Sequence, residues 1–246
     1  MRPYVVLSGA RAAYVGPGLD LEPHHNAAAT LAVALDHPFE YSRMGNDPAP
    51  PRHADRVLIP PDTRHHLRAD GRVAFLYLDA TSDEYEALQG GDWGGTPAAR
   101  TAAQRAFTHP TGPPSHQILG MLEAMGITAR KGLDPRVREV ARSLSANPQL
   151  FTSVSIAANQ ARLSTHRFQH LFRAEMGVPF RRYRRWSRMA VAARVIADGG
   201  SLTDAALEAG FSSSAHFSAS FRGLFGLSPS RLLSAGVELR IDRNDG

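Results

Sequence analysis

The chain has 246 residues, 43% of them hydrophobic, with no cysteine and a formal net charge of +5. This length allows one or two domains with real cores, and the absence of cysteine excludes disulfides, thiol redox chemistry, cysteine-bound zinc and alkyl transfer to a cysteine. No apolar run approaches the roughly 18 residues of a membrane helix, and the N-terminus has no secretory signal pattern, so we expect a cytoplasmic protein.

Residues 1 to about 92 predict a β-rich region. Apolar or alternating runs at residues 4–8, 30–35, 57–59 and 73–78 have the length of strands, and clusters of Gly, Pro and Asp separate them. Short strands with such turn signals are typical of a β-barrel or sandwich. The mouth of such a barrel commonly holds a small organic ligand. Four residues are candidate effector contacts by their type and strand position: Tyr41, His66, Phe75 and Tyr77.

Part of this region resembles a cupin domain. The stretch VLIPPDTRHHLRADGRVAFLYLD, residues 57–79, is similar to the later half of a cupin, with Pro61, Asp62, Thr63 and His66 on the family's P-x-G-x-x-H turn. Thr63 replaces the glycine of that turn. The resemblance implies a reduced, cupin-like sensor barrel.

Two histidine pairs, His24-His25 and His65-His66, are the candidates for a metal site. Imidazoles from different strands can ligate a transition metal. Neighbouring strand residues point to opposite faces, however, so each pair offers at most one inward ligand. The sequence also lacks the upstream H-x-H with a distant Glu that the cupin resemblance would lead us to expect. We therefore predict no metal and no other cofactor, and histidines that are exposed or hydrogen-bonded.

The middle of the chain predicts helices and connections. Helical patterns cover residues 83–89, 97–107, 115–126 and 134–145. The pattern at 115–126 has one apolar stripe, which fits either a core helix against the barrel or a dimer helix. Residues 130–132, Arg-Lys-Gly, are a candidate hinge before the last of these helices.

Residues 155–231 contain a divergent internal repeat. The matched residues, at equal spacing, are Ala158, Ala161, Leu163, Phe168, Phe172-Arg173 and Gly177 in the first copy and Ala206, Ala209, Phe211, Phe217, Phe221-Arg222 and Gly226 in the second. Each copy predicts a short Ala-rich helix, a turn with a serine N-cap and a second helix with one apolar stripe, which is a helix-turn-helix unit. Between the copies, residues 179–198 predict a helix of about 30 Å, close to the roughly 34 Å of one DNA turn.

The polar face of each second helix carries candidate base contacts. They are Thr165, His166, Gln169 and His170 in the first copy and Ser214, Ala215, Ser218 and Ala219 in the second. Gln169 can pair with adenine and the two histidines can donate to guanine or phosphate, whereas the second set offers only methyl groups and small hydroxyls. We therefore expect the first of these helices to carry most of the direct readout.

Positive charge is concentrated in the same region. Residues 133–235 carry 14 Arg and 6 acidic residues, a net charge of +8, whereas residues 1–132 have a net charge of −2. The candidate phosphate contacts, which give affinity without sequence information, are Arg173, Arg181, Arg184, Arg185 and Arg222.

The order of these parts resembles the DNA-binding domain of the AraC/XylS family of bacterial transcription regulators. The pattern A-x-x-A-x-L-S, F-x-x-L-F-R and G-x-P, followed by A-G-F-S-S-S-x-H-F-S and F-G-x-S-P, lies within residues 133–233. The resemblance implies a sequence-specific DNA-binding regulator that is not an enzyme, with double-stranded DNA and a small-molecule effector as partners. RNA polymerase is a further candidate partner, and a homodimer is a candidate assembly. Arg188 matches a family position followed by an apolar residue, and the resemblance implies that it braces the two halves of this domain internally instead of contacting phosphate.

We predict a multi-domain fold, with a cupin-like β-barrel or sandwich and connecting helices followed by an all-α domain of two helix-turn-helix units joined by a long helix. The predicted boundaries are 1–95 for the sensor domain, 96–132 for the connecting helices, 133–235 for the DNA-binding domain and 236–246 for a tail. Two alternatives stay open: a cupin-type metal-dependent enzyme with an appended helical domain, and an architectural DNA binder without a sensor.

Overall fold

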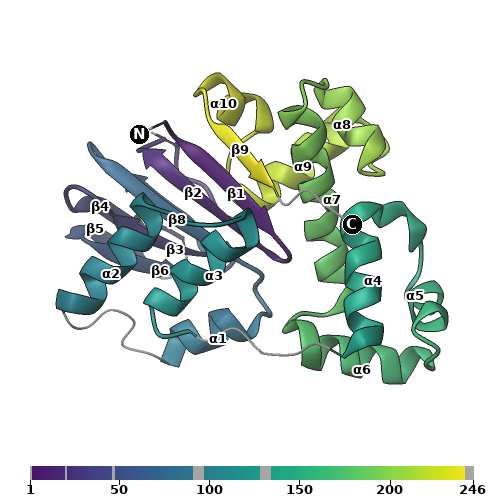
Figure 1. The fold of residues 1–246 in the computed structure, drawn as a ribbon. Helices are drawn as coiled ribbons and strands as arrows, with labels where there is room; N and C mark the ends of the chain where they lie inside the picture. The colour runs from purple at the N-terminus through teal and green to yellow at the C-terminus, as the bar shows by residue number, and fades with distance from the viewer. Residues whose placement is uncertain (1, 20, 46–47, 91–96, 128–133, 242–246) are drawn as a thin grey trace.

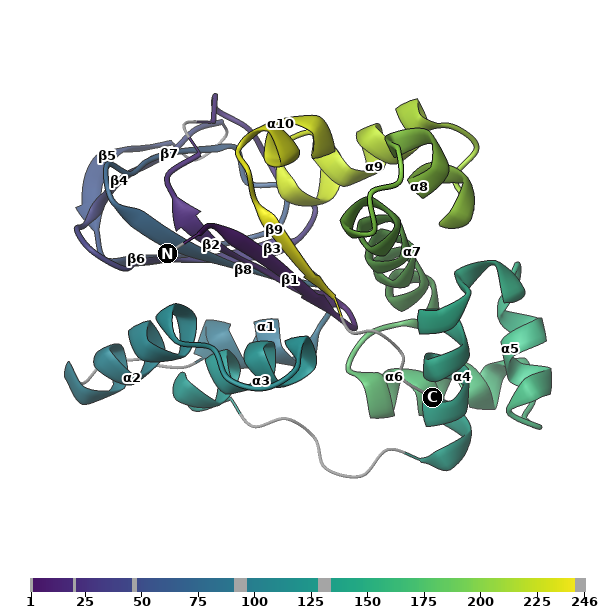
Figure 2. The same ribbon diagram turned by 45° about the horizontal axis from the view of Figure 1, so that its top comes forward.

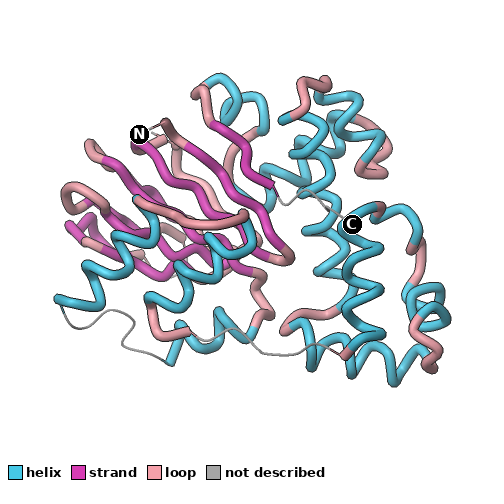
Figure 3. Tube along the Cα trace, viewed as in Figure 1, coloured by secondary structure: helices cyan, strands magenta, loops and turns pink. Residues whose placement is uncertain are grey.

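The computed structural model describes residues 2–19, 21–45, 48–90, 97–127 and 134–241. Strands gather in the N-terminal part of the chain and helices dominate the C-terminal part (Figure 1, Figure 3). This arrangement confirms the predicted fold class of a sheet-rich domain followed by a helical domain. The candidate hinge at residues 130–132 and the predicted boundaries after residues 95 and 132 lie outside the described residues.

The N-terminal domain is a sandwich of two sheets. Its strands are β1 (Tyr4–Ser8), β2 (Arg11–Pro17), β3 (Ala29–Ala34), β4 (Phe39–Arg43), β5 (Ala49–Ala54), β6 (Arg56–Ile59), β7 (His65–Arg68) and β8 (Arg72–Leu78), with β9 (Glu238–Ile241) added from the end of the chain. The larger sheet has the order β6-β3-β8-β2-β1-β9 and the smaller has the order β5-β4-β7. The strands predicted at 4–8, 30–35, 57–59 and 73–78 are confirmed as β1, β3, β6 and β8.

The central strands of the larger sheet are buried on both faces, so β1, β2, β3 and β8 are apolar almost throughout, whereas the edge strands β6 and β9 are partly exposed. Three helices cover one face (Figure 2): α1 (Asp83–Gly90), α2 (Pro97–Thr108) and α3 (Pro114–Ala124). On this face Val6 and Leu76 belong to one apolar cluster with Ile118, Met121 and Leu122 of α3. The helix predicted at 115–126 is therefore a core helix, which confirms the first of its two interpretations.

The opposite face of the larger sheet points toward the smaller sheet and the helical domain. Val5 and Tyr14 on this face belong to the same apolar cluster as Trp186, Phe217 and Phe225 of the helical domain. One continuous core thus passes from the sandwich into the helices, and the two domains pack closely together.

The helical domain contains the predicted repeat. Its elements are α4 (Pro135–Ala146), the 3-10 helix η1 (Pro148–Leu150), α5 (Val154–Gln160), α6 (Thr165–Met176), α7 (Phe180–Ala197), α8 (Leu202–Glu208), α9 (Ser214–Phe225) and α10 (Pro229–Ser234). Ser164 and Ser213 cap α6 and α9 by accepting a backbone N–H three residues on. Gly177 and Gly226 end these helices at φ values of +74° and +79°, which glycine adopts without a steric penalty. Within the described residues, no helix combines the length and apolar character needed to cross a bilayer.

The described chain ends in a strand that the sequence did not predict. β9 lies in the segment expected to be a tail, and it pairs in parallel with β1, placing Glu238 opposite Tyr4 and Ile241 opposite Leu7. Glu238 and Arg240 interrupt the apolar residues of this short segment, and its pairing partner lies at the other end of the chain. β9 covers a strand edge whose backbone groups would otherwise lack partners, and it ties the helical domain to the sandwich.

Candidate DNA interface and ligand cavity

The two copies of the repeat fold as the helix pairs α5–α6 and α8–α9. Ala158 and Ala206, at equivalent positions, are buried, and their small side chains let each first helix lie close to its partner. Phe168 and Phe217 are the equivalent buried residues on the second helices. The same side chains therefore do the same packing in both copies, which confirms the internal repeat.

The predicted base contacts lie together on the two second helices. On α6 Thr165, His166, Gln169 and His170 are all exposed, and on α9 Ala215 and Ala219 are exposed while Ser214 and Ser218 are half-buried. The two histidines on α6 are neighbours, with 3.2 Å between their Nε2 atoms. Among these predicted base contacts, those on α6 offer hydroxyl, amide and imidazole groups, whereas those on α9 offer only methyl groups and hydroxyls.

Three candidate phosphate contacts line one cleft between α7 and α9. Arg181, Arg184 and Arg185 share this cleft of about 510 Å³ with His216. Arg184 donates from Nε to a carbonyl of η1 at 3.2 Å, and burial lowers the pKa of its guanidinium. The cleft gathers positive charge beside the second helix-turn-helix unit, which suits it to anions such as phosphate. Arg222, another candidate, is exposed on α9.

Arg188 braces the helical domain internally, as the sequence predicted. Its Nε donates to the carbonyl of Ala209 at 2.8 Å, and its guanidinium also donates to the carbonyl of Gly210. The guanidinium lies 3.8 Å from the centroid of the Phe211 ring. These partners form the turn between α8 and α9, so Arg188 fixes the second unit against the connecting helix α7.

Two further arginines are paired with acidic residues of the N-terminal domain. Arg173 on α6 lies 2.9 Å from Asp83. Arg182 on α7 donates from Nε to both oxygens of Asp79 at 2.6 and 2.9 Å, and the indole of Trp186 donates to Asp79 at 3.0 Å. The Asp79 side chain is 4% exposed, and these bonds supply the charge and donors that a buried carboxylate requires. Arg173, predicted to contact phosphate, is held by the N-terminal domain in this structure.

Backbone and ring contacts continue this interface. The amide of Ala27, just before β3, donates to the carbonyl of Gly223 in α9 at 2.7 Å. The ring of Tyr77 packs edge-on against Phe225, with 5.1 Å between centroids. Both contacts join the sandwich to α9, the second helix of the second helix-turn-helix unit.

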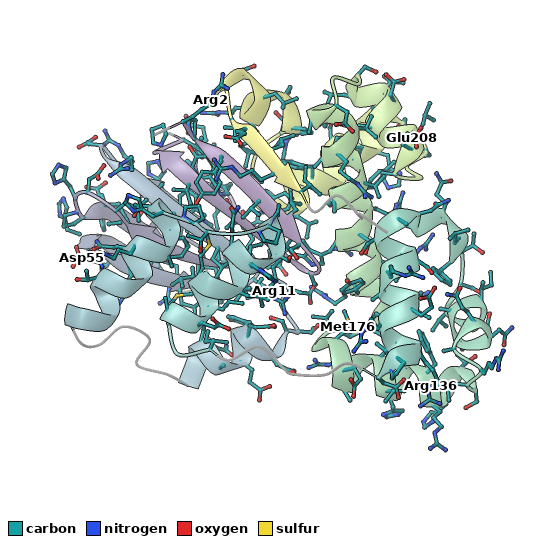
Figure 4. The ribbon with its side chains drawn as sticks, viewed as in Figure 1. Arg2, Arg11, Asp55, Arg136, Met176 and Glu208 are labelled. Carbon is teal, nitrogen blue, oxygen red and sulfur yellow. The ribbon has the colours of Figure 1, made fainter. Side chains whose placement is uncertain are left out.

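A cavity of about 290 Å³, with both polar and apolar lining residues, lies elsewhere between the two domains. Arg11 from β2 and Met176 from α6 line this cavity from opposite domains, and both residues are labelled in Figure 4. Arg11 is itself ion-paired with Glu84 of α1. The interface therefore combines close ion pairs with open space.

A smaller cavity of about 20 Å³ lies inside the sandwich. Its polar lining consists of His24, Asn26, Thr30 and His65, and its apolar lining consists of Leu19, Leu21, Ile59, Leu67, Phe75 and Tyr77. An apolar cavity of about 40 Å³ shares Leu19 and Tyr77 with it and extends between the sheet and α9, where Phe225 lines it. Apolar space with a few polar groups at a domain interface is a common site for small ligands.

The candidate effector contacts divide between this lining and its surroundings. Phe75 and Tyr77 line the cavity, as predicted by their position on β8. His65 lines it in place of His66, because adjacent residues of β7 point to opposite faces and His65 is the buried one. Tyr41 lies on the smaller sheet, with its ring centroid 6.4 Å from that of His65, and is not among the lining residues.

Asn26 and Thr30 are lining residues that the sequence analysis missed. Both are buried, and Nδ2 of Asn26 donates to the hydroxyl of Thr30 at 3.0 Å. Asn26 belongs to an irregular stretch before β3 and carries no periodic signal. Thr30 is the single polar residue in the otherwise apolar strand ATLAVA, and a polar residue at a core position is a signal that could have identified it.

The two inward histidines are neutral and share one hydrogen-bonding arrangement. His65 and His24 each contact a backbone carbonyl through Nδ1, that of Thr63 and that of Glu22 respectively, both at 2.9 Å. Because a carbonyl can only accept, Nδ1 carries the proton and Nε2 of the neutral ring is an acceptor. Burial lowers the pKa of both imidazoles, to about 4 for His65. Among the described residues, no group of three or more His, Cys, Asp and Glu side chains could hold a metal ion.

Comparison with known proteins finds matches to the helical region and to the fold as a whole. A family model described as a helix-turn-helix domain matches residues 157–235. Apo ToxT from Vibrio cholerae strain SCE256 is similar in structure, with a TM-score of 0.52 and 12% identity over 94% of this chain and 99% of that one. ToxT of the same strain with a bound unsaturated fatty acid gives a TM-score of 0.48 and 12% identity over 96% of each chain. The C-terminal domain of AraT, a response regulator from Geobacillus stearothermophilus, gives a TM-score of 0.39 and 20% identity over 46% of this chain and 93% of that one. No curated protein matches the chain.

These observations define the class of the protein. The chain has paired helix-turn-helix units with exposed polar faces, a cluster of arginines and a two-domain fold shared with apo ToxT. These are the features of a DNA-binding transcription regulator. Its helix-turn-helix domain, residues 157–235, is of the AraC type, as the sequence predicted.

Proposed function

We propose that this regulator reads double-stranded DNA with α6 and α9 and that a small molecule bound by the N-terminal domain controls it. The observation that carries the proposal is the pairing of Asp79 and Asp83 with Arg182 and Arg173. The N-terminal domain thereby occupies cations of the DNA-binding domain, so docking competes with phosphate binding. A ligand between the domains shifts the docking equilibrium by its difference in affinity for the docked and undocked forms.

In this proposal the two recognition helices have unequal roles. Gln169 pairs with adenine, while His166, His170 and Thr165 read neighbouring bases or phosphates. On α9, Ser214, Ala215, Ser218 and Ala219 make methyl and hydroxyl contacts. Affinity that is independent of sequence comes from Arg181, Arg184, Arg185 and Arg222, joined by Arg173 once it is released from Asp83. The support for this assignment is the exposure of the α6 residues and the shared arginine cleft.

The predicted domain boundaries enter the proposal with one change. We assign residues 1–95 to the sensor, 96–132 to the connecting helices and 133–235 to the DNA-binding domain, and we add β9 to the sheet of the sensor because it pairs with β1. The regulator acts in the cytoplasm, beside RNA polymerase. We assign it no catalytic role, because the match to a helix-turn-helix domain supports a regulator.

Selection of DNA from a random pool by the full chain tests the proposal. We expect enrichment of a site with two half-sites about 10 base pairs apart, because α6 and α9 are joined by a helix close in length to one DNA turn. Footprinting on the selected site should show protection of two successive major grooves. Failure of any sequence to be enriched, with protein that is folded, would contradict the proposal.

A further inference from the structure

His216, in the first turn of α9, is an exposed imidazole that the predicted base and phosphate contacts do not include. Its side chain lines the cleft of about 510 Å³ between α7 and α9. Its Nδ1 lies 3.0 Å from the hydroxyl oxygen of Ser212, and its ring packs edge-on against Phe211 with 5.3 Å between centroids. Phe211 is buried and also contacts the guanidinium of Arg188. The imidazole is therefore held on two sides, and Nε2 is its polar atom without a partner among the described residues.

The cleft gathers positive charge that its own lining does not neutralise. None of the described lining residues is Asp or Glu, and the charged ones are Arg181, Arg184, Arg185 and Arg188. Burial and the charge of Arg184 lower the pKa of the Arg188 guanidinium, so these cations lie close enough to repel each other. The N-terminal turn of α9 adds the positive end of a helix dipole to the same cleft. A bound anion would relieve this repulsion, so the lining is that of an anion site.

The cleft borders the face of α9 that carries its predicted base contacts. His216 follows the exposed Ala215 by one residue, which places it about 100° further around the helix. Ser220, one residue after the exposed Ala219, lines the cleft as well. A helix in the major groove has a phosphate backbone on each side of it. The backbone phosphates of DNA read by α9 are therefore the anions that this cleft is placed to meet.

We infer that His216 donates from Nε2 to one backbone phosphate of the bound DNA, which it holds in the cleft together with Arg181 and Arg185. The inference rests on the proposed function, because it adds a contact to the same DNA interface. Ser212 positions the ring. A phosphate selects the arrangement in which the Ser212 hydroxyl donates to Nδ1, since the proton of the ring then stands on Nε2. Such a contact gives affinity and fixes the position of α9 on the DNA without reading sequence.

Ethylation interference on the selected DNA site tests the contact with the full chain. Ethylation of one phosphate beside the half-site of α9 should block the unaltered chain, and His216→Leu should no longer be sensitive at that phosphate. Its affinity should fall about tenfold on selected and random DNA alike, as loss of a hydrogen bond to a charged group does. His216→Gln, whose amide can place an N–H near the position of Nε2, should recover most of the affinity. Ser212→Ala should lose about threefold, and the control His53→Leu, at an exposed position on β5, should change neither affinity nor pattern.

Two results would overturn the inference: unchanged affinity of His216→Leu, or a loss of affinity with the ethylation pattern of the unaltered chain. If His216→Leu does not fold, Ser212→Ala decides, because reduced sensitivity at a single phosphate supports the inference and an unchanged pattern contradicts it. Failure of the proposed function gives a different result. Protection of two major grooves with no phosphate that depends on His216 would show that this contact alone is wrong. A tenfold loss on random DNA, by a chain that selects no site, would leave the phosphate contact standing and remove the reading of sequence.

Discussion

Substitution of Asp79 by Asn perturbs the interface at its most buried ion pair. The carboxylate accepts from Arg182, Trp186 and the backbone and side chain of Thr81. Removing one partner of a buried pair costs about 3–5 kcal/mol when the other charge stays buried. The side chain of Arg182 is 31% exposed, so water recovers part of its solvation, and we expect a cost to docking of about 2 kcal/mol.

This change has a defined consequence for DNA binding. A cost of about 2 kcal/mol is roughly a thirtyfold change in the docking equilibrium. If docking competes with DNA, the affinity of Asp79→Asn for its selected site rises by up to that factor, depending on how fully the unaltered chain is docked. Fluorescence anisotropy at one fixed salt concentration measures the affinities. The control is Asp36→Asn, which removes an exposed ion pair with Arg72 within the N-terminal domain and should leave DNA affinity unchanged.

A specific result would refute this reasoning. If Asp79→Asn lowers the midpoint of thermal unfolding, showing that the interface has been weakened, but binds DNA no more tightly than the Asp36→Asn control, docking does not compete with DNA. The acidic residues would then have a purely structural role, and control through the interface would have to be abandoned.

Three further predictions follow from other parts of the structure. A fragment of residues 130–235 should bind the selected DNA more tightly than the full chain in gel shifts, because no acidic partner from the sandwich remains, and a folded fragment that does not bind would contradict the domain division. Arg188→Ala should lower the free energy of unfolding, measured in urea, by about 2 kcal/mol, because charge-assisted hydrogen bonds to the turn before α9 are lost. Arg188→Lys should also lower it, since Lys lacks the planar donors, and full stability of that variant would argue against the bracing role. Stability should fall as the pH is lowered from about 6.5 toward 4, because the unfolded chain protonates His65 near its ordinary pKa of 6.5 while burial holds the folded pKa at about 4. His65→Gln should reduce this slope in urea titrations and the exposed-site control His53→Gln should not, and equal slopes in both variants would contradict the assignment.

The helical domain could be predicted from sequence because its signals are local. Apolar residues at spacings of three and four, serine caps at Ser164 and Ser213 and closing glycines all lie within the helices they define, and the second copy repeats the first. The bracing role of Arg188 could be predicted in the same way, from its place in a pattern. The strands β1, β3, β6 and β8 were predictable from their apolar runs and the turn residues beside them, whereas β2, β4, β5 and β7 were not predicted.

The features that were missed depend on partners distant in the chain. β9 exists because β1 offers an open edge more than 200 residues away. Arg173 was taken as available for phosphate, but its partner Asp83 stands 90 positions earlier. The choice between His65 and His66 depends on strand register, since a shift of one residue exchanges the two faces. Asn26 lies in an irregular segment, where the sequence has no period to read.

The central claim is that α6 reads DNA sequence, and Gln169→Ala tests it most directly. Anisotropy titrations would compare this variant with Gln160→Ala, a matched control on α5 whose side chain bonds to Ser143, on the selected site and on random DNA. The account predicts that Gln169→Ala loses about 1–3 kcal/mol on the selected site, relaxes the preference at one base pair and leaves binding to random DNA nearly unchanged. Equal losses on selected and random DNA, or a loss no larger than that of Gln160→Ala, would contradict it.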